Sequence, residues 1–159
     1  MGEIISRRLF LALPLVGCAA DGALYQPDSV SVSKGMGTIY VYRPQLEIGK
    51  QGEEPFVAIN RKSYGRMRTG SYVAGTFREG DYNVTVQQSI FLLIPTIPKT
   101  ISVTVVRGSM TYVRVDQTID TIGMAGDASV SQSTSIEEVP FEIGQAELAK
   151  TRLNRNTTK

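Results

Sequence analysis

The side chains of this chain that could do chemistry are one thiol and a set of dispersed carboxylates. The 159 residues include one cysteine, Cys18, and no histidine. Without histidine there is no Ser-His or Cys-His nucleophile pair, no side chain whose ordinary pKa lies near neutrality and no imidazole ligand for zinc. The composition therefore excludes most hydrolase templates, and we expect no cofactor and no metal site.

Carboxylates are the remaining candidates for acid-base chemistry. The acids available to a cell-wall hydrolase are Glu53, Glu54, Asp81 and Asp116. Their spacing in the sequence does not indicate which two of them would form the pair of carboxylates that glycoside hydrolysis needs. A looser series, Asp116, Asp120 and Asp127, lacks the dense oxygen ligands and the tight glycine turn of a calcium loop. We interpret that series as part of a solvated loop and expect no catalytic residue.

Cys18 stands at the end of an N-terminal signal. Arg7 and Arg8 precede a short apolar run, residues 9–16, and Gly17 places a small residue directly before the cysteine. The run is far shorter than the roughly 20 apolar residues that span a bilayer, so it is not a transmembrane helix. The pattern resembles a bacterial lipoprotein signal. The alternative is the start of a cytosolic domain with one buried cysteine.

The resemblance to lipoprotein signals implies a chemical role for Cys18. Its thiol would be linked to diacylglycerol, and cleavage would leave it as the first residue of the mature chain. Residues 6–11 also resemble the twin-arginine export motif, although an ordinary Sec signal carries positive charge there too. Ala19 and Ala20 follow the cysteine in place of an inner-membrane aspartate. We expect a palmitate-bearing lipoprotein of the outer membrane that faces the periplasm, with the inner membrane or the cell surface less favoured.

Length and charge predict one domain that does not bind nucleic acid. The 17 basic and 15 acidic residues leave a net charge of +2, whereas nucleic-acid-binding domains are more strongly basic. We expect four parts in the chain. They are a signal peptide over residues 1–17, a lipidated flexible tether over 18–36, a folded domain over 37–155 and a disordered tail over 156–159.

Alternation of apolar and polar residues with period two predicts an all-β fold. The expected strands cover residues 38–43, 56–59, 63–67, 71–77, 82–87, 101–105 and 111–115. Short strands bounded by turns favour an antiparallel β-sandwich of about seven strands, because each strand buries one face and needs a second layer. Arg43 is expected at a strand end, solvated or ion-paired.

The C-terminal third of the chain is expected to be less regular. Residues 121–136, rich in Ser, Thr, Gly and Ala, are interpreted as a long mobile loop. Pro140 confines residues 139–143 to an edge strand or to irregular structure. Residues 144–154 contain good helix formers and predict a short C-terminal helix.

One apolar run, residues 90–98, contains two prolines and fits neither a central strand nor an ordinary exposed loop. Two interpretations stay open. The run projects and contacts a partner or the membrane, or it finishes a strand with both faces covered. The candidate contact residues are Ile90, Phe91, Leu92, Leu93 and Ile94.

Four motifs carry a resemblance to a family of small bacterial lipoproteins catalogued as a domain of unknown function. They are Gly37-Thr-Ile-Tyr-Val-Tyr-Arg43-Pro44, Gly65-Arg-Met-Arg-Thr-Gly70-Ser-Tyr72, Glu79-Gly80-Asp-Tyr82-Asn-Val84-Thr-Val86 and Arg107-Gly108-Ser-Met-Thr-Tyr112-Val113-Arg114-Val115. Glu79-Gly80-Asp81 departs from the family's usual Pro-Gly-His. The resemblance implies a sandwich in the envelope and transfers no catalytic residue.

Three functions follow from these observations. The main hypothesis is a non-enzymatic lipoprotein of the outer membrane that binds or scaffolds another envelope protein through strand edges or through residues 90–98. The second is a small-ligand or glycan-binding module that uses its tyrosines as a stacking platform. The third is the carboxylate-dependent hydrolase. The tyrosines concerned are Tyr40, Tyr42, Tyr72, Tyr82 and Tyr112.

Overall fold

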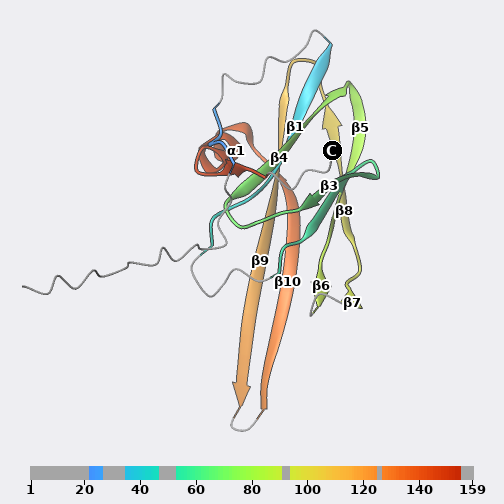
Figure 1. The fold of residues 1–159 in the computed structure, drawn as a ribbon. Helices are drawn as coiled ribbons and strands as arrows, with labels where there is room; N and C mark the ends of the chain where they lie inside the picture. Colours follow the sequence, from blue (N-terminus) through green and yellow to red (C-terminus); the bar gives the residue numbers. More distant parts are fainter. Residues whose placement is uncertain (1–21, 27–34, 47–52, 91–93, 125–126, 155–159) are drawn as a thin grey trace, which may run out of the picture.

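The computed structural model describes residues 22–26, 35–46, 53–90, 94–124 and 127–154, which form two packed β-sheets and one helix (Figure 1). The strands are β1 (Met36–Arg43), β2 (Phe56–Ile59), β3 (Lys62–Arg66), β4 (Ser71–Arg78), β5 (Gly80–Gln87), β6 (Ser89–Ile90), β7 (Ile94–Pro95), β8 (Lys99–Val105), β9 (Met110–Met124), β10 (Asp127–Val139) and β11 (Arg152–Leu153). The helix is α1 (Phe141–Leu148). The expected all-β sandwich is confirmed.

The two sheets differ in their connections. Sheet A has the order β10-β9-β1-β4-β11, and sheet B has the order β3-β2-β5-β8. Sheet B is antiparallel throughout. Sheet A contains two parallel pairs, β1 with β9 and β11 with β4, so the sandwich is mixed rather than wholly antiparallel. Strands β6 and β7 pair only with each other among the described residues.

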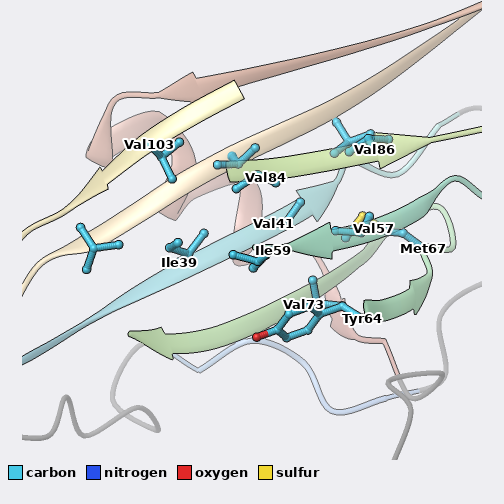
Figure 2. Close-up of a cluster of buried hydrophobic side chains, with 13 residues drawn as sticks. Ile39, Val41, Val57, Ile59, Tyr64, Met67, Val73, Val84, Val86 and Val103 are labelled. Carbon is cyan, nitrogen blue, oxygen red and sulfur yellow. The ribbon is translucent and has the colours of Figure 1, made fainter. Parts of the chain in front are cut away.

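The main core lies between the sheets and follows the period-two pattern. Val84 and Val86 of β5 face Ile39 and Val41 of β1, and all four are buried (Figure 2). Alternate residues on these strands point to the opposite face of their sheet, as the pleat requires. The buried members of the cluster are Ile39, Val41, Val57, Ile59, Tyr64, Met67, Val73, Val84, Val86, Val103, Val105, Val113 and Val115.

A second core lies on the outer face of sheet A, beneath α1. Tyr40 stacks on Tyr112 with ring centroids 5.5 Å apart, and Tyr25 meets Tyr40 edge-on at the same separation. Leu148 of α1 is fully buried in this cluster, and a Cβ at Gly144 would come within 2.4 Å of the Tyr112 ring. Glycine therefore allows α1 to approach the tyrosines closely.

The C-terminal helix is shorter and begins earlier than residues 144–154 predict. Val139 ends β10, Pro140 occupies the N-cap position, and Phe141 starts α1. A proline is compatible with a helix start because the first N–H groups of a helix have no intrahelical partner. The Thr151 hydroxyl donates to the Leu148 carbonyl at the C-terminal end, and the chain then turns into β11.

Residues 121–136, expected as a loop, belong instead to two long strands. β9 continues to Met124, and β10 pairs with it antiparallel from Asp127 to Val139. The sequence carries a signal for this: serine stands at every second position from 129 to 135, alternating with Ala128, Val130, Gln132, Thr134 and Ile136. Serine and threonine tolerate a strand whose outer face is exposed.

The expected tether over residues 18–36 is also wrong in part. Residues 22–26 belong to the folded domain, where Tyr25 is buried among the tyrosines of sheet A. The burial of Tyr25 could not be predicted because it is a single aromatic residue in a short segment without periodicity. Cys18 and residues 27–34 lie outside the described residues.

Candidate interaction surface

A two-stranded ribbon extends from one end of the sandwich (Figure 1). We use the name ribbon for residues 116–124 of β9 and 127–135 of β10, which pair with each other. The parallel pairing of β9 with β1 ends at Arg114. Among the described residues, the ribbon strands therefore pair only with each other, and each leaves its outer edge open.

The composition of the ribbon does not protect those edges. Natural proteins block exposed strand edges with lysine, proline or bulges, because open N–H and C=O groups accept a further strand. From Gln117 to Ile136 the sequence contains no lysine, arginine or proline, and its charged residues are Asp120 and Asp127. An added strand is the natural occupant of such an edge.

Arg43 fixes the base of the ribbon from inside the sandwich. Its side chain is 1% exposed and donates to the Met67 carbonyl, at 3.2 Å, and to Oε1 of Gln117. Gln117 Nε2 in turn donates to the Glu53 carbonyl at 2.9 Å. This network links β1 and β9 to the segments that flank β2 and β3. Arg43 ends β1 as expected, but it is buried rather than solvated.

Burial of Arg43 has an electrostatic cost. Loss of hydration lowers the pKa of the Arg43 guanidinium to about 10, although the charge of Glu54 acts in the opposite direction. The group stays protonated at neutral pH. Its hydrogen bonds are charge-assisted and stronger than neutral ones, so they hold the base of the ribbon in one geometry.

The β6–β7 hairpin leaves the same end of the sandwich from sheet B (Figure 1). Thr96 closes its base: its N–H and hydroxyl both donate to the Gln88 carbonyl, at 2.8 and 2.9 Å. The buried Gln88 side chain accepts from the Thr134 hydroxyl of β10. That contact ties the hairpin to the ribbon.

Two of the five candidate contact residues, Ile90 and Ile94, lie on this hairpin. Ile90 ends β6 and pairs with Ile94, which begins β7. Phe91, Leu92 and Leu93 lie outside the described residues. Ile90 and Ile94 thus pair with each other, and the role of the run in contact with a partner stays a prediction. Ile97, which follows β7 in the chain, is 89% exposed.

The carboxylates considered for hydrolysis are engaged by separate partners. Asp116 lies 2.8 Å from Arg114, Glu54 lies 3.5 Å from Arg68, and Asp81 accepts from the Thr104 hydroxyl at 2.7 Å. Glu53 contributes its backbone carbonyl to the Arg43 network. Among the described residues no group of three His, Cys, Asp or Glu side chains is placed to hold a metal ion.

Asp116 belongs to a cluster around Arg114 at the base of the ribbon. Arg114 also contacts Glu137 at 2.5 Å and Glu147 of α1 at 3.2 Å, and the Tyr42 hydroxyl donates to Glu147 at 2.5 Å. Burial raises the pKa of Asp116, and the Arg114 charge partly opposes that shift. One cation holding three carboxylates makes a structural clamp between β9, β10 and α1.

The tyrosines do not form a surface platform. Tyr40, Tyr42, Tyr72 and Tyr112 are at most 8% exposed, and Tyr82 packs partly buried against Phe77 with ring centroids 4.7 Å apart. The structure instead has a polar groove of about 510 Å³ at the β2–β3 turn and the neighbouring parts of β5 and β8. It is lined by Asn60, Arg61, Asn83, Thr85 and Thr100.

The β2–β3 turn shapes the groove. Asn60 and Arg61 both adopt positive φ, 44° and 68°, as the two central residues of a tight hairpin turn do. The Asn60 side chain accepts from the backbone N–H of Asn83 at 2.7 Å, and the hydroxyls of Thr85 and Thr100 are 2.9 Å apart. The groove thus offers one guanidinium, amides and hydroxyls.

Comparison with known families identifies the chain. A family model described as a protein of unknown function, DUF2846, matches residues 33–128, more than half of the chain. The chain belongs to the DUF2846 family. The DUF2846 match covers β1 to β9 and ends at Ala128, so most of β10, α1 and β11 lie beyond it. No curated protein and no solved structure matches the chain.

The described residues contain no helix that is long and apolar enough to cross a membrane.

Proposed function

We propose that this DUF2846 protein is a non-enzymatic envelope lipoprotein, anchored in the outer membrane through Cys18, whose sandwich binds another envelope protein. The partner adds a strand to an edge of the ribbon. Cys18 supplies the anchor because it follows a signal with basic, apolar and small residues in the order of a lipoprotein signal.

The ribbon is the observation that carries the binding role. Ten residues of β9, Val115–Met124, continue past the pairing with β1 and keep an open edge among the described residues. Such edges are costly to leave exposed because they promote aggregation. A partner strand that pairs with the edge satisfies its backbone groups, which accounts for an edge without lysine or proline.

The arrangement of carboxylates supports a binding role over hydrolysis. General acid-base catalysis requires a carboxyl within reach of a substrate, with a pKa suited to proton transfer. Asp116 is held by Arg114 in the clamp, and Glu54 and Asp81 have partners of their own. These contacts give each acid a structural role.

A photocrosslinker at Ser129 tests partner binding by the ribbon. The full chain carries it in the native envelope, with the crosslinker at Thr76 as a control, since Thr76 is exposed on β4, away from the ribbon. We expect one discrete crosslinked product from Ser129 and none from Thr76. Ser131→Lys with Ser133→Lys should cost about 1.4 kcal/mol of binding, a tenfold loss of product.

The control substitutions Thr76→Lys and Ala146→Lys add the same charge at exposed positions away from the ribbon. They should leave the Ser129 product unchanged. Equal crosslinking from Ser129 and Thr76, or a product that survives the ribbon lysines in a folded chain, would contradict binding through the ribbon edge.

The groove favours a second candidate function, the binding of a small hydroxylated ligand. Muropeptides carry hydroxyls, amides and carboxylates, which match the groove's threonines, asparagines and Arg61. In calorimetric titration of the Cys18→Ala chain with muropeptides, Arg61→Ala should weaken binding about tenfold. Arg78→Ala, an exposed arginine on β4, is the matched control. Absence of saturable binding by the unsubstituted groove removes this candidate.

A further inference from the structure

The N-terminal segment Gly22–Gln26 is ordered and hydrogen-bonded to the rest of the domain. The Tyr25 N–H donates to the Thr151 carbonyl at 3.1 Å, and the Leu153 N–H donates to the Ala23 carbonyl at 2.8 Å. Leu24 forms an antiparallel bridge with Arg152 of β11. These bonds extend the edge of sheet A by a short strand-like segment.

Packing confirms that this segment is fixed. A Cβ at Gly22 would lie 1.9 Å from the Leu153 carbonyl oxygen, so the backbone is pressed against β11. The Tyr25 ring is 5% exposed and meets Tyr40 and Tyr72 edge-on. The segment therefore cannot swing away without opening the core beneath α1.

The distance from this segment to Cys18 is short. Four peptide units join Cys18 to Gly22, and consecutive Cα atoms are about 3.8 Å apart, so the two Cα atoms lie within about 15 Å of each other. A lipid on Cys18 would hold the edge of sheet A at β11 within that distance of the bilayer surface. A long tether would leave the orientation open, whereas this one restricts it.

The surface around the segment has the chemistry of a membrane-facing side. Leu24 is 50% exposed and Leu153 38% exposed, and the neighbouring Lys150 and Arg152 are also exposed. Apolar side chains flanked by lysine and arginine suit the headgroup region of an anionic bilayer. The nearest acid on α1, Glu147, is held by Arg114 and Tyr42.

We propose that this side, formed by Leu24, Lys150, Arg152 and Leu153 and called the anchor side below, lies against the membrane headgroups. The proposal rests on the proposed lipidation of Cys18. Segment 22–26 and α1 cover the face of sheet A opposite to sheet B (Figure 1). Sheet B, with its groove and the β6–β7 hairpin, is then turned toward the periplasm.

Single-cysteine labelling of the lipidated chain tests the orientation. The chain has one native cysteine, which the lipid occupies, so an introduced cysteine is the only free thiol. A fluorophore is attached at Leu24→Cys, Lys150→Cys or Ser102→Cys, and the chain is reconstituted in anionic vesicles with a headgroup-attached quencher. Ser102 lies exposed on β8 of sheet B and is the control.

We expect quenching at positions 24 and 150 to exceed that at 102 by about threefold or more. Lys150→Glu should reduce quenching at 24, whereas Lys62→Glu on β3 should not. Equal quenching at all three positions, with the chain still bound to vesicles and folded by circular dichroism, overturns the orientation alone. A parent chain that does not sediment with vesicles overturns the lipid anchor and, with it, this proposal.

Discussion

The free energy of unfolding is expected to fall steeply once the pH rises above about 10. Burial raises the pKa values of five tyrosines above their ordinary 10.0, and for Tyr42 the hydrogen bond to Glu147 adds to the shift. The five are Tyr40, Tyr42, Tyr64, Tyr72 and Tyr112. Four of them belong to the cluster beneath α1, and Tyr64 lies in the main core. Burial of these hydroxyls therefore makes the fold sensitive to alkaline pH.

The sign follows from proton binding. Above pH 10 these tyrosines ionise in the unfolded chain but stay protonated in the folded one, so the unfolded state binds fewer protons and stability falls as pH rises. Tyr40, Tyr42 and Tyr112, which have the largest shifts, each contribute about 1.4 kcal/mol per pH unit, or about 4 kcal/mol per unit together, and Tyr64 and Tyr72 add to the fall. Domains of this size are stable by about 5–15 kcal/mol, so we expect unfolding within a few pH units above pH 10.

Arg43 acts in the opposite direction. Its pKa is lowered to about 10 in the folded state, so between that pH and its ordinary value the unfolded chain binds the extra proton and stability rises with pH. One arginine does not offset five tyrosines. The net slope stays negative.

Absorbance of tyrosinate near 295 nm and far-ultraviolet circular dichroism, followed together against pH, measure this effect. We expect tyrosine ionisation and loss of β-structure in one cooperative transition. Tyr40→Phe, which removes one of the strongly shifted groups, should reduce the slope by about one proton. Gradual ionisation centred on pH 10 in a chain that keeps its circular dichroism would contradict the burial of the tyrosines.

Cys18→Ala is expected to release the protein from membranes completely. The three acyl chains of a mature lipoprotein make anchoring nearly permanent, since each buried methylene contributes about 0.8 kcal/mol. Without them, Leu24 and Leu153 leave a binding surface too small to hold the chain. Fractionation of membranes measures the loss, and a thermal melt of the released chain should match that of the anchored domain.

Ala19→Ser is the matched control, because it changes a neighbouring residue and keeps the thiol. That variant should remain in the membrane fraction. A Cys18→Ala chain that stays with the membrane would show that another segment provides the anchor.

Local pattern was sufficient to predict most of the sandwich. The alternation in residues 82–87, 101–105 and 111–115 predicts strands that the structure confirms within β5, β8 and β9. Asn60 and Arg61 form the turn between β2 and β3, in the gap between the strands expected over residues 56–59 and 63–67. In these segments burial of one face of a strand decides the conformation, and neighbouring residues carry the whole signal.

Pairings between distant segments could not be predicted in the same way. The parallel contact of β1 with β9 and the docking of Tyr25 on Tyr40 depend on tertiary packing, for which one sequence offers no local pattern. The ribbon is a different case, because residues 129–135 alternate with period two, as a strand does, but have the small, polar composition typical of a loop.

In the candidate surfaces too, local features could be predicted from the sequence and contacts between distant residues could not. Arg43 follows Ile39 and Val41 at the next inward position of β1, so period two places it in the core. Its partner Gln117 lies 74 residues away and could not be inferred. The groove likewise joins a hairpin turn to two other strands and has no motif in the sequence.

The N-terminal peptide of the membrane-bound protein tests the lipid anchor most directly. Mass spectrometry of that peptide, isolated after proteolysis of the membrane fraction, reads both the first residue and its modification. We expect a chain that begins at Cys18 and carries diacylglycerol in thioether linkage on the thiol. A chain that begins elsewhere, or a Cys18 with an unmodified thiol, would contradict it.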